Sequence, residues 1–356
     1  MQRVFIRPHW KIGATSDSAF DTNQLLQLLA AVQDTGAIAQ AARSVDLSYR
    51  HAWGLIKRAE ALFGGALLDS GRGRGSVLTP LGSKLIWADK RISARLSPLL
   101  ESLASELEGE LERALAQAGG VLRLNASHGF AVATLLEHLG RAQLPVELRY
   151  RNSLESMAAL SRGDCDLAGF HVPLGEFEAR AAQRFLRWLQ PAKHSLVHLA
   201  VRSQGLFVAA GNPLGIRGVA DLRRPQVRFV NRPEGSGTRV LTELLLQQAG
   251  IAPHEVRGFE SAEFTHAAVA AFIASGMADV GLGVQTAAQR FGLEFVPLVR
   301  ERYFFALRSD ALADAPVAAV VRLLQSATYR SAVAALPGYD TARTGQILSL
   351  QEAFGS

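Results

Sequence analysis

The segment from Asn231 to Arg239 combines groups that bind an anion. It holds two arginines that donate charged hydrogen bonds, two hydroxyl side chains, and glycines that let a ligand approach the backbone. It follows an expected strand at 227–230 and precedes an expected helix from Thr238, where backbone N–H groups and the helix dipole favour negative charge. The alternative is an ordinary capped helix start. The candidate ligand-binding residues are Arg232, Ser236, Gly237, Thr238 and Arg239.

Further polar side chains stand where other expected strands end or helices begin, so we expect them to face the same site. They are Ser127, His128, Asn152, Ser153, His171, Thr265 and His266. Hydroxyl and amide donors can hold an anion without a full countercharge. The three histidines come from separate segments without a local metal-ligand motif, so we expect no metal ligands here.

These residues do not form a catalytic pattern. Ser127 and His128 are adjacent on a strand end, so their side chains point to opposite faces. The chain has no Gly-x-Ser-x-Gly sequence, and no lysine follows the glycines of 231–239 as a nucleotide-binding P-loop requires. We therefore expect no catalytic residues and no cofactor, and a binding protein rather than an enzyme.

A second group of side chains is typical of a DNA-binding surface. Ser48 caps an expected helix whose N-terminus can reach base edges and phosphates, and two arginines lie among glycines in an expected hairpin at 71–80. Trp53 fits either the core or the contact surface of this helix. The candidate DNA contacts are Ser48, Tyr49, Arg50, His51, Lys57, Arg58, Arg72 and Arg74.

The charge of the chain supports a polyanionic partner. The first 95 residues contain thirteen Lys or Arg and seven Asp or Glu, which accounts for the net charge of +6 of the whole chain. The rest of the chain is neutral overall, so the positive charge is concentrated where DNA contacts are expected.

The elements that position the DNA contacts form an α+β domain over residues 1–79. We predict a short strand, three helices and a hairpin wing, at 4–7, 23–34, 38–44, 48–63 and 71–80. Gly36 and the glycines after Phe63 end two of the helices. Three helices and a basic, glycine-rich wing are the parts of a winged helix-turn-helix.

The sequence predicts a long linker helix over residues 80–118. Leucines recur at spacings of mainly three and four residues from Leu81 to Leu115, and glutamates alternate with them after position 105. We expect Pro98 to kink or divide the helix. The leucines either pack on their own domain or form a seam between two copies, and we favour a homodimer, which can pair further into a tetramer.

Residues 119–356 alternate strands and helices as an α/β domain with two lobes. Lobe one covers about 121–203 plus 303–356, and lobe two about 204–302. A strand–helix–strand–helix–strand pattern over 121–170 repeats over 227–283, with a second-lobe strand expected at 256–260. Strands near 206–210 and 303–307 are expected to cross between the lobes. Ligands of such folds bind at the carboxyl ends of the strands, here between the lobes.

Residues 34–42, 47–53 and the wing ending in Leu78-Thr-Pro-Leu-Gly resemble the N-terminal domain of the ModE family of molybdate-responsive regulators, with LysR-type regulators as more distant relatives. The Ser-Gly-Thr loop at 236–238 resembles that of type II periplasmic phosphate- and tungstate-binding proteins. The resemblance implies a transcriptional regulator that senses molybdate or tungstate and controls molybdenum uptake or molybdoenzyme genes. The small β-barrel sensor domains of ModE are not found.

Other effectors and other classes of protein stay open. Formate or another small carboxylate, sulfate or phosphate would also suit Arg232 and the hydroxyl donors. A different class would be an oxyanion-delivery protein or a molybdenum-cofactor enzyme. The chain has one cysteine, Cys165, no apolar signal sequence and no long apolar run, so we expect a cytoplasmic protein without a membrane partner. The expected partner of the winged helix-turn-helix is operator DNA.

Overall fold

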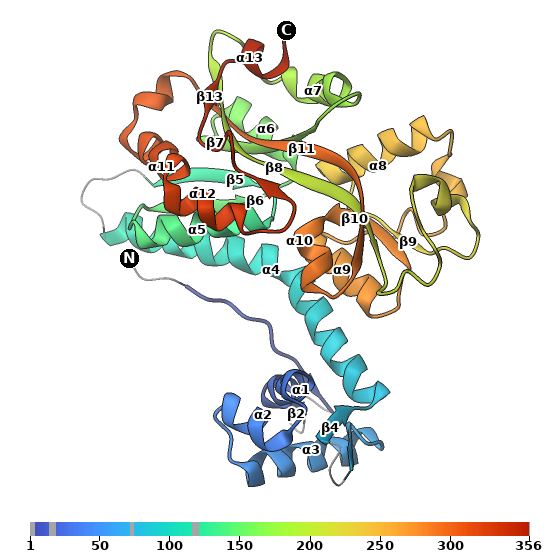
Figure 1. The fold of residues 1–356 in the computed structure, drawn as a ribbon. Coiled ribbons are helices and arrows are strands. Elements are labelled where there is room, and N and C mark those ends of the chain that lie inside the picture. The colour runs from blue at the N-terminus through green and yellow to red at the C-terminus, as the bar shows by residue number, and fades with distance from the viewer. Residues whose placement is uncertain (1–3, 14–18, 72–74, 116–120, 356) are drawn as a thin grey trace. The chain divides into compact units, whose positions relative to one another are not determined.

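The computed structural model describes residues 4–13, 19–71, 75–115 and 121–355, which form two compact units. The smaller unit covers residues 7–96, and the larger covers residues 1–6 and 97–356 (Figure 1). One helix, α4 (Pro80–Leu115), contributes its first half to the smaller unit and its second half to the larger. Pro98 lies inside α4 without dividing it.

The smaller unit has the predicted winged helix-turn-helix. Its elements before α4 are β1 (Lys11–Ile12), β2 (Phe20–Asp21), α1 (Asn23–Thr35), α2 (Ile38–Ser44), α3 (Tyr49–Phe63), β3 (Leu68–Gly71) and β4 (Gly75–Leu78). The three helices lie where the sequence predicted them, but the wing begins earlier than predicted, because its first strand starts at Leu68 and not at Gly71. The predicted strand at 4–7 is wrong: the Val4 N–H donates to the Glu108 carboxylate at 2.7 Å instead of joining a strand ladder.

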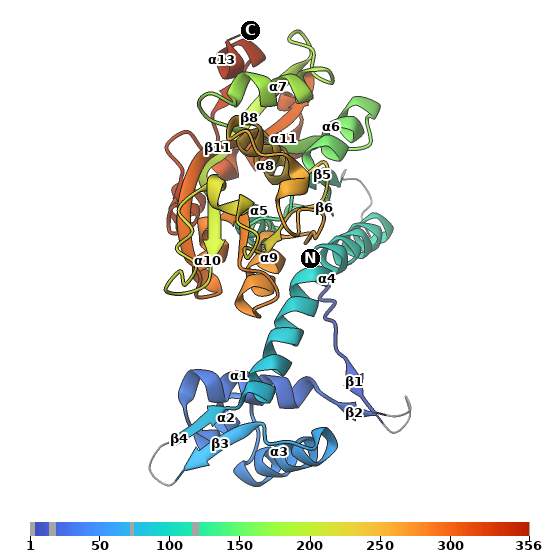
Figure 2. The same ribbon diagram turned by 90° about the vertical axis from the view of Figure 1, so that its right-hand side faces the viewer.

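Apolar positions at helical spacing build the core of this unit. Leu25, Leu28 and Leu29 of α1 pack against Ala52 and Ile56 of α3. The wing strands β3 and β4 pair antiparallel and lie beside α3 (Figure 2). The core thus fixes α3 by one face, and the opposite face is left to solvent.

The larger unit alternates strands and helices, as predicted. Its helices of more than one turn and its sheet strands are β5 (Leu122–Ala126), α5 (Phe130–Arg141), β6 (Val146–Tyr150), α6 (Ser153–Arg162), β7 (Leu167–Pro173), α7 (Glu178–Leu186), β8 (His194–Val208), β9 (Phe229–Val230), α8 (Gly237–Gln248), α9 (His266–Ala274), β10 (Val280–Val284), α10 (Gln285–Arg290), β11 (Glu294–Arg308), α11 (Ala315–Gln325), α12 (Ala327–Ala334), β12 (Tyr339–Asp340), β13 (Ile347–Leu348) and α13 (Leu350–Phe354). Three short 3-10 helices lie at Val219–Arg223, Pro253–Glu255 and Asp310–Ala313.

One sheet runs through both lobes in the order β6-β5-β7-β11-β8-β10-β9, with β12 and β13 pairing with β8. The crossing strands are longer than predicted, because β8 and β11 pair antiparallel over fifteen residues each and extend through both lobes. The predicted strand at 256–260 is wrong. That stretch is a turn in which Gly258 has φ +91°. Ala262, two residues after the stretch, forms an isolated bridge to Asn231.

Helices cover both faces of the sheet, and alternating strand residues point to each face. Phe304 of β11 belongs to a buried cluster with residues of α6, α7 and α8, whereas its neighbour Phe305 belongs to a cluster with residues of α5, α11 and α12. The C-terminal helices therefore return to lobe one, as predicted. The Tyr329 hydroxyl of α12 donates to the Ala131 carbonyl of α5 at 3.0 Å.

Candidate anion-binding site and DNA-binding surface

Four helices of the larger unit begin at or next to the candidate ligand-binding residues. Their N-cap residues are Gly129 of α5, Asn152 of α6, Ser236 of α8 and Thr265 of α9. A Cβ placed on Gly235 would lie 3.1 Å from Asn152 Nδ2, and one on Gly237 would lie 3.3 Å from His171 Cβ, so segments of both lobes meet here. Helix N-termini carry partial positive charge and unpaired N–H groups, which together favour an anion.

Arg232 carries the main charge of this site. Its side chain is buried, and its Nη2 donates to the Phe264 carbonyl at 2.7 Å. Its Nε and Nη1 are buried without a hydrogen-bond partner among the described residues. Burial and the charge of Arg202 lower the pKa of Arg232 to about 9, so the guanidinium remains charged at neutral pH. Two charged donors without an acceptor point to an anionic ligand.

Arg202 and Glu301 form a buried ion pair beside Arg232. The two residues are register partners on β8 and β11, and Arg202 Nε lies 2.5 Å from Glu301 Oε1. Gln204 Nε2 donates to the same carboxylate at 2.8 Å and to Thr238 Oγ1 at 3.0 Å. The pair is neutral overall, so Arg232 leaves the site with a net positive charge.

Two histidines of the site are neutral at neutral pH. Burial first, and then the charges of Arg202 and Arg232, lower the pKa values of His171 and His266 well below 6.5. His171 stacks on Tyr303 with ring centroids 3.9 Å apart and has its Nδ1 3.5 Å from Ser153 Oγ. Within the described chain, His171 Nε2 and His266 Nδ1 have no hydrogen-bond partner. Both nitrogens can therefore hydrogen-bond to a ligand.

Several of the predicted ligand-binding residues form hydrogen bonds with the protein backbone, so these groups are not free for a ligand. The Ser236, Thr265 and Asn152 oxygens accept from backbone N–H groups of their own helices. The Ser127 backbone N–H donates to the Tyr303 hydroxyl at 3.1 Å. These residues shape the site by placing helix N-termini.

Arg239 is directed away from the other predicted ligands. Its Nε donates to Glu243 at 2.9 Å, its Nη1 donates to the Phe259 carbonyl at 3.1 Å, and its guanidinium covers the Phe259 ring. Its donors are thus used inside lobe two.

Sequence reasoning missed four residues of the site: Arg202, Gln204, Glu301 and Tyr303. A signal was present, since Arg202 and Gln204 alternate within the apolar run at 196–208. Polar side chains at period two on one face of a buried strand indicate a polar cluster or a site.

No group of three His, Cys, Asp or Glu side chains that could hold a metal ion occurs in the part of the chain that the structure describes. No helix among these described residues is long and apolar enough to cross a bilayer.

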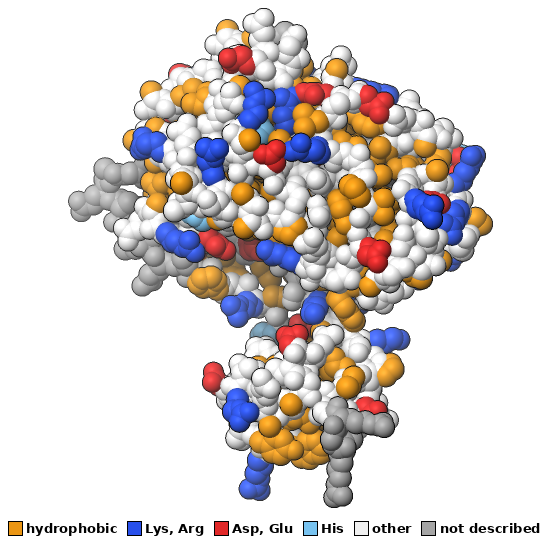
Figure 3. All heavy atoms as spheres, viewed as in Figure 1, with side chains coloured by type: hydrophobic (Ala, Val, Ile, Leu, Met, Phe, Trp, Pro, Cys, Tyr) orange, Lys and Arg blue, Asp and Glu red, His pale blue; other side chains and the backbone are white. Residues whose placement is uncertain are grey.

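The exposed face of α3 carries the predicted DNA contacts. Ser48 accepts from the His51 N–H at 3.2 Å and caps the helix. Tyr49, Arg50 and Arg58 are exposed on this face. Figure 3 shows hydrophobic side chains near α3 at the end of the smaller unit, with Lys or Arg side chains close by. This surface suits phosphates and base edges.

Two predicted contacts have partners inside the unit, and two lie beyond the description. The ring of His51 lies 3.4 Å from the Gln24 amide oxygen, and Lys57 pairs with Glu60 at 2.8 Å. Arg72 and Arg74 lie outside the described residues. Trp53 is exposed, so the contact surface is favoured over the core for this residue.

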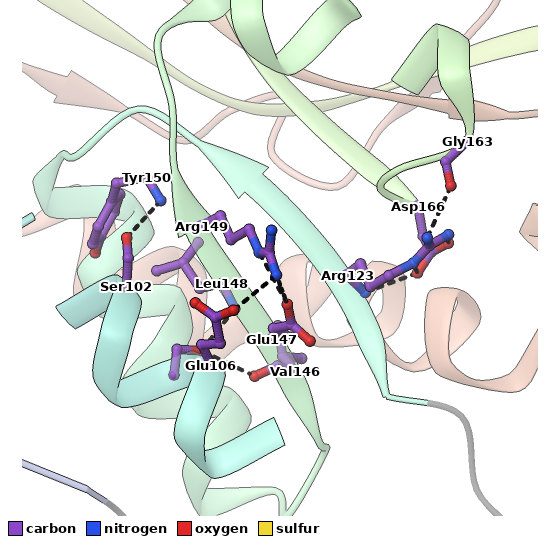
Figure 4. Close-up of polar contacts among 11 residues, drawn as sticks. Ser102, Glu106, Arg123, Val146, Glu147, Leu148, Arg149, Tyr150, Gly163 and Asp166 are labelled. Carbon is purple, nitrogen blue, oxygen red and sulfur yellow. Dashed lines mark hydrogen bonds and ion pairs between the residues drawn. The ribbon is translucent and has the colours of Figure 1, made fainter. Parts of the chain in front are cut away.

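The second half of α4 covers the outer edge of the sheet (Figure 4). β6 is the outermost strand, so its outward N–H groups have no partner strand. The Ser102 hydroxyl accepts from the Tyr150 N–H at 2.9 Å and the Ser105 hydroxyl accepts from the Leu148 N–H at 2.7 Å. Glu101, the residue before Ser102, lies 3.6 Å from His128 Nε2. This helix therefore touches a strand and a loop that lead into the site.

Comparison with protein families matches both halves of the chain. Residues 136–325 match the PBP superfamily domain, and residues 23–83 match the bacterial regulatory helix-turn-helix protein, lysR family.

Three curated proteins are similar over different lengths. YvgK of Bacillus subtilis is 34% identical over 217 residues, which cover 60% of this chain and 69% of YvgK. The HTH-type transcriptional regulator CbbR of Rhizobium meliloti is 27% identical over 315 residues, covering 85% of this chain and 92% of CbbR. The molybdenum-pterin-binding protein MopB of Rhodobacter capsulatus is 38% identical over 108 residues, covering 29% of this chain and 39% of MopB.

Proposed function

Because the chain belongs to the PBP superfamily and carries a LysR-family helix-turn-helix, it is a ligand-responsive transcriptional regulator, and we propose that its effector is a small oxyanion, molybdate or tungstate. The observation that carries the proposal is Arg232, a buried guanidinium with two unpartnered donors where four helices begin. An oxyanion offers several acceptors within a small volume, which suits donors converging from several sides.

Molybdate or tungstate is preferred among oxyanions for two reasons. The DNA-binding half resembles the ModE family, and MopB, a relative over 108 residues, is named as a molybdenum-pterin-binding protein. Formate or another small carboxylate is the second candidate, because one carboxylate can satisfy Nε and Nη1 of Arg232 together.

The effector would act on the linker helix. An anion held by Arg232 and the α5 and α6 N-termini orders the loop of His128 and the end of β6, and both contact α4. Since α4 continues into the DNA-binding unit, a shift of this helix changes how the regulator engages its operator in the cytoplasm.

The effector is tested by thermal unfolding of the purified full-length protein with molybdate, tungstate, sulfate, phosphate and formate. A ligand specific to the folded state at about one hundred times its Kd stabilises by about 2.7 kcal/mol, which raises Tm by roughly 5–10 °C. We expect the rise with molybdate or tungstate. A rise with formate alone would replace the effector, and no rise with any anion would refute the anion site.

We further propose that α4 forms a homodimer seam. A stripe of leucines along this helix is exposed to solvent in a single chain: Leu96, Leu99, Leu103, Leu107 and Leu111. Their spacing of three and four residues places them on one side of the helix, where a second copy can cover them.

Placing a charge in this stripe is expected to dissociate the protein. Leu103→Glu combined with Leu107→Glu buries carboxylates in the seam, so sedimentation should show half the mass of the unmodified protein at micromolar concentration. Glu137→Gln, an exposed position on α5, serves as the control and should leave the mass unchanged. An unchanged mass in the leucine variant would assign the stripe another role.

A further inference from the structure

The exposed face of α3 carries an aromatic pair. Tyr49 and Trp53 are 57% and 37% exposed, and their rings stack with centroids 6.4 Å apart and planes 14° from parallel. They lie one helical turn apart, next to Ala52 and Ile56 around the helix, at the edge of the face that fills the core. Both rings keep part of their apolar surface in water, which forgoes the stabilisation that full burial would give.

The orientation of Trp53 is fixed by its neighbours. Tyr49 stacks on the ring, and Lys57 Nζ lies 5.0 Å from the ring centroid. Lys57 is in turn held by Glu60 at 2.8 Å. A ring already held in place loses little conformational freedom when a ligand contacts it.

The backbone beside Trp53 is open to close approach. Gly54 is exposed in the middle of α3, and a Cβ placed there would have no neighbour within 4 Å. A glycine inside a helix is about 1 kcal/mol less favourable than alanine, so this residue weakens the helix. The missing side chain leaves room for DNA to approach the backbone. Arg50 and Arg58 flank it on the same face and can reach phosphates.

We propose that Tyr49 and Trp53 determine operator specificity by packing against the 5-methyl groups of thymines in the major groove. The edges of the other bases in this groove offer hydrogen-bond donors and acceptors, and the thymine methyl is the apolar group. A flat apolar surface on a helix that enters the groove can thus pack against the thymine methyl group. This inference concerns the DNA-binding half and does not depend on the identity of the effector.

The test removes the methyl group and nothing else. Operator DNA is selected from a random duplex pool with the full-length protein, and each thymine of the selected site is then replaced by deoxyuridine. For the unmodified protein we expect one or two thymines whose replacement weakens binding about fourfold each, the ratio that corresponds to one buried methyl group. Trp53→Ala and Tyr49→Ala should bind thymine and deoxyuridine duplexes alike.

Arg58→Ala is the matched control, because it removes a charged group from the same exposed face. It should weaken binding to all duplexes and keep the fourfold ratio between thymine and deoxyuridine. Unfolding curves of the three variants check that each is folded, as their exposure predicts. Selected sites without a methyl-sensitive thymine, or an undiminished ratio in both aromatic variants, would overturn the proposal.

Discussion

Replacing Arg232 by glutamine is expected to abolish the stabilisation of the protein by its anion. The change removes two buried charged donors, Nε and Nη1, that have no protein acceptor among the described residues. Hydrogen bonds to charged groups contribute about 1.5–3 kcal/mol each, so the Kd should rise at least about 100-fold. Arg232→Lys should fail as well, because an ammonium group cannot present a planar pair of donors.

For the same variant we expect the thermal stability of the anion-free protein to stay the same or rise, in contrast to the loss of anion binding. Without the anion, Tm of Arg232→Gln should equal or exceed that of the unmodified protein, since a buried cation without a paired carboxylate has been removed. Arg239→Gln is the control: its guanidinium is occupied by Glu243 and the Phe259 carbonyl, so the anion should still raise Tm. An anion response that survives in Arg232→Gln but is lost in Arg239→Gln would reverse the assignment.

Replacing Glu301 by glutamine is expected to destabilise the free protein and strengthen anion binding. Arg202 and Glu301 are both almost fully buried, and Arg202 Nε lies 2.5 Å from the carboxylate. Breaking a buried pair leaves a buried charge and costs about 3–5 kcal/mol, which lowers Tm by on the order of 10 °C. Arg202 and Arg232 then both lack a countercharge, so the affinity for a dianion should rise severalfold.

Unfolding in denaturant and anion titration of the folded protein measure these two effects separately. Asp310→Asn removes the carboxylate of an exposed pair with Arg308 and should change neither quantity. A stable Glu301→Gln protein, or one that binds the anion more weakly, would mean that this carboxylate does not set the charge of the site.

The helices of the DNA-binding unit could be read from the sequence because their signals are local. Ser48 begins α3 and Gly36 and Gly64 end α1 and α3 in left-handed conformations, as the residue types predict. The apolar residues of α1 recur at the helical period, so the sequence directly predicts which face of the helix is buried. The short strands were harder to predict. Val4 follows a strand-like pattern, but its N–H is taken by Glu108, 104 positions away.

The sequence alone also indicated where groups that can bind an anion occur. The segment at 231–239 stands before a helix, and Arg232 and Thr238 are recognisable there from their types and neighbours. The same reasoning selected Arg239, whose orientation depends on Glu243 and the turn at Phe259. Local sequence thus identifies a helix N-terminus, but not which of two nearby arginines keeps donors without a protein acceptor among the described residues.

Only the tertiary structure decided the charge of the site. Arg202 and Glu301 are 99 positions apart and meet because β8 and β11 pair in one register; a slip of one residue would place them on opposite faces of the sheet. Register over that distance is set by packing on both faces, for example of Phe304 and Phe305, and no short sequence pattern contains it. The sequence therefore determined the groups that can bind an anion, whereas strand pairing decided that Arg232 is the one left without a paired carboxylate.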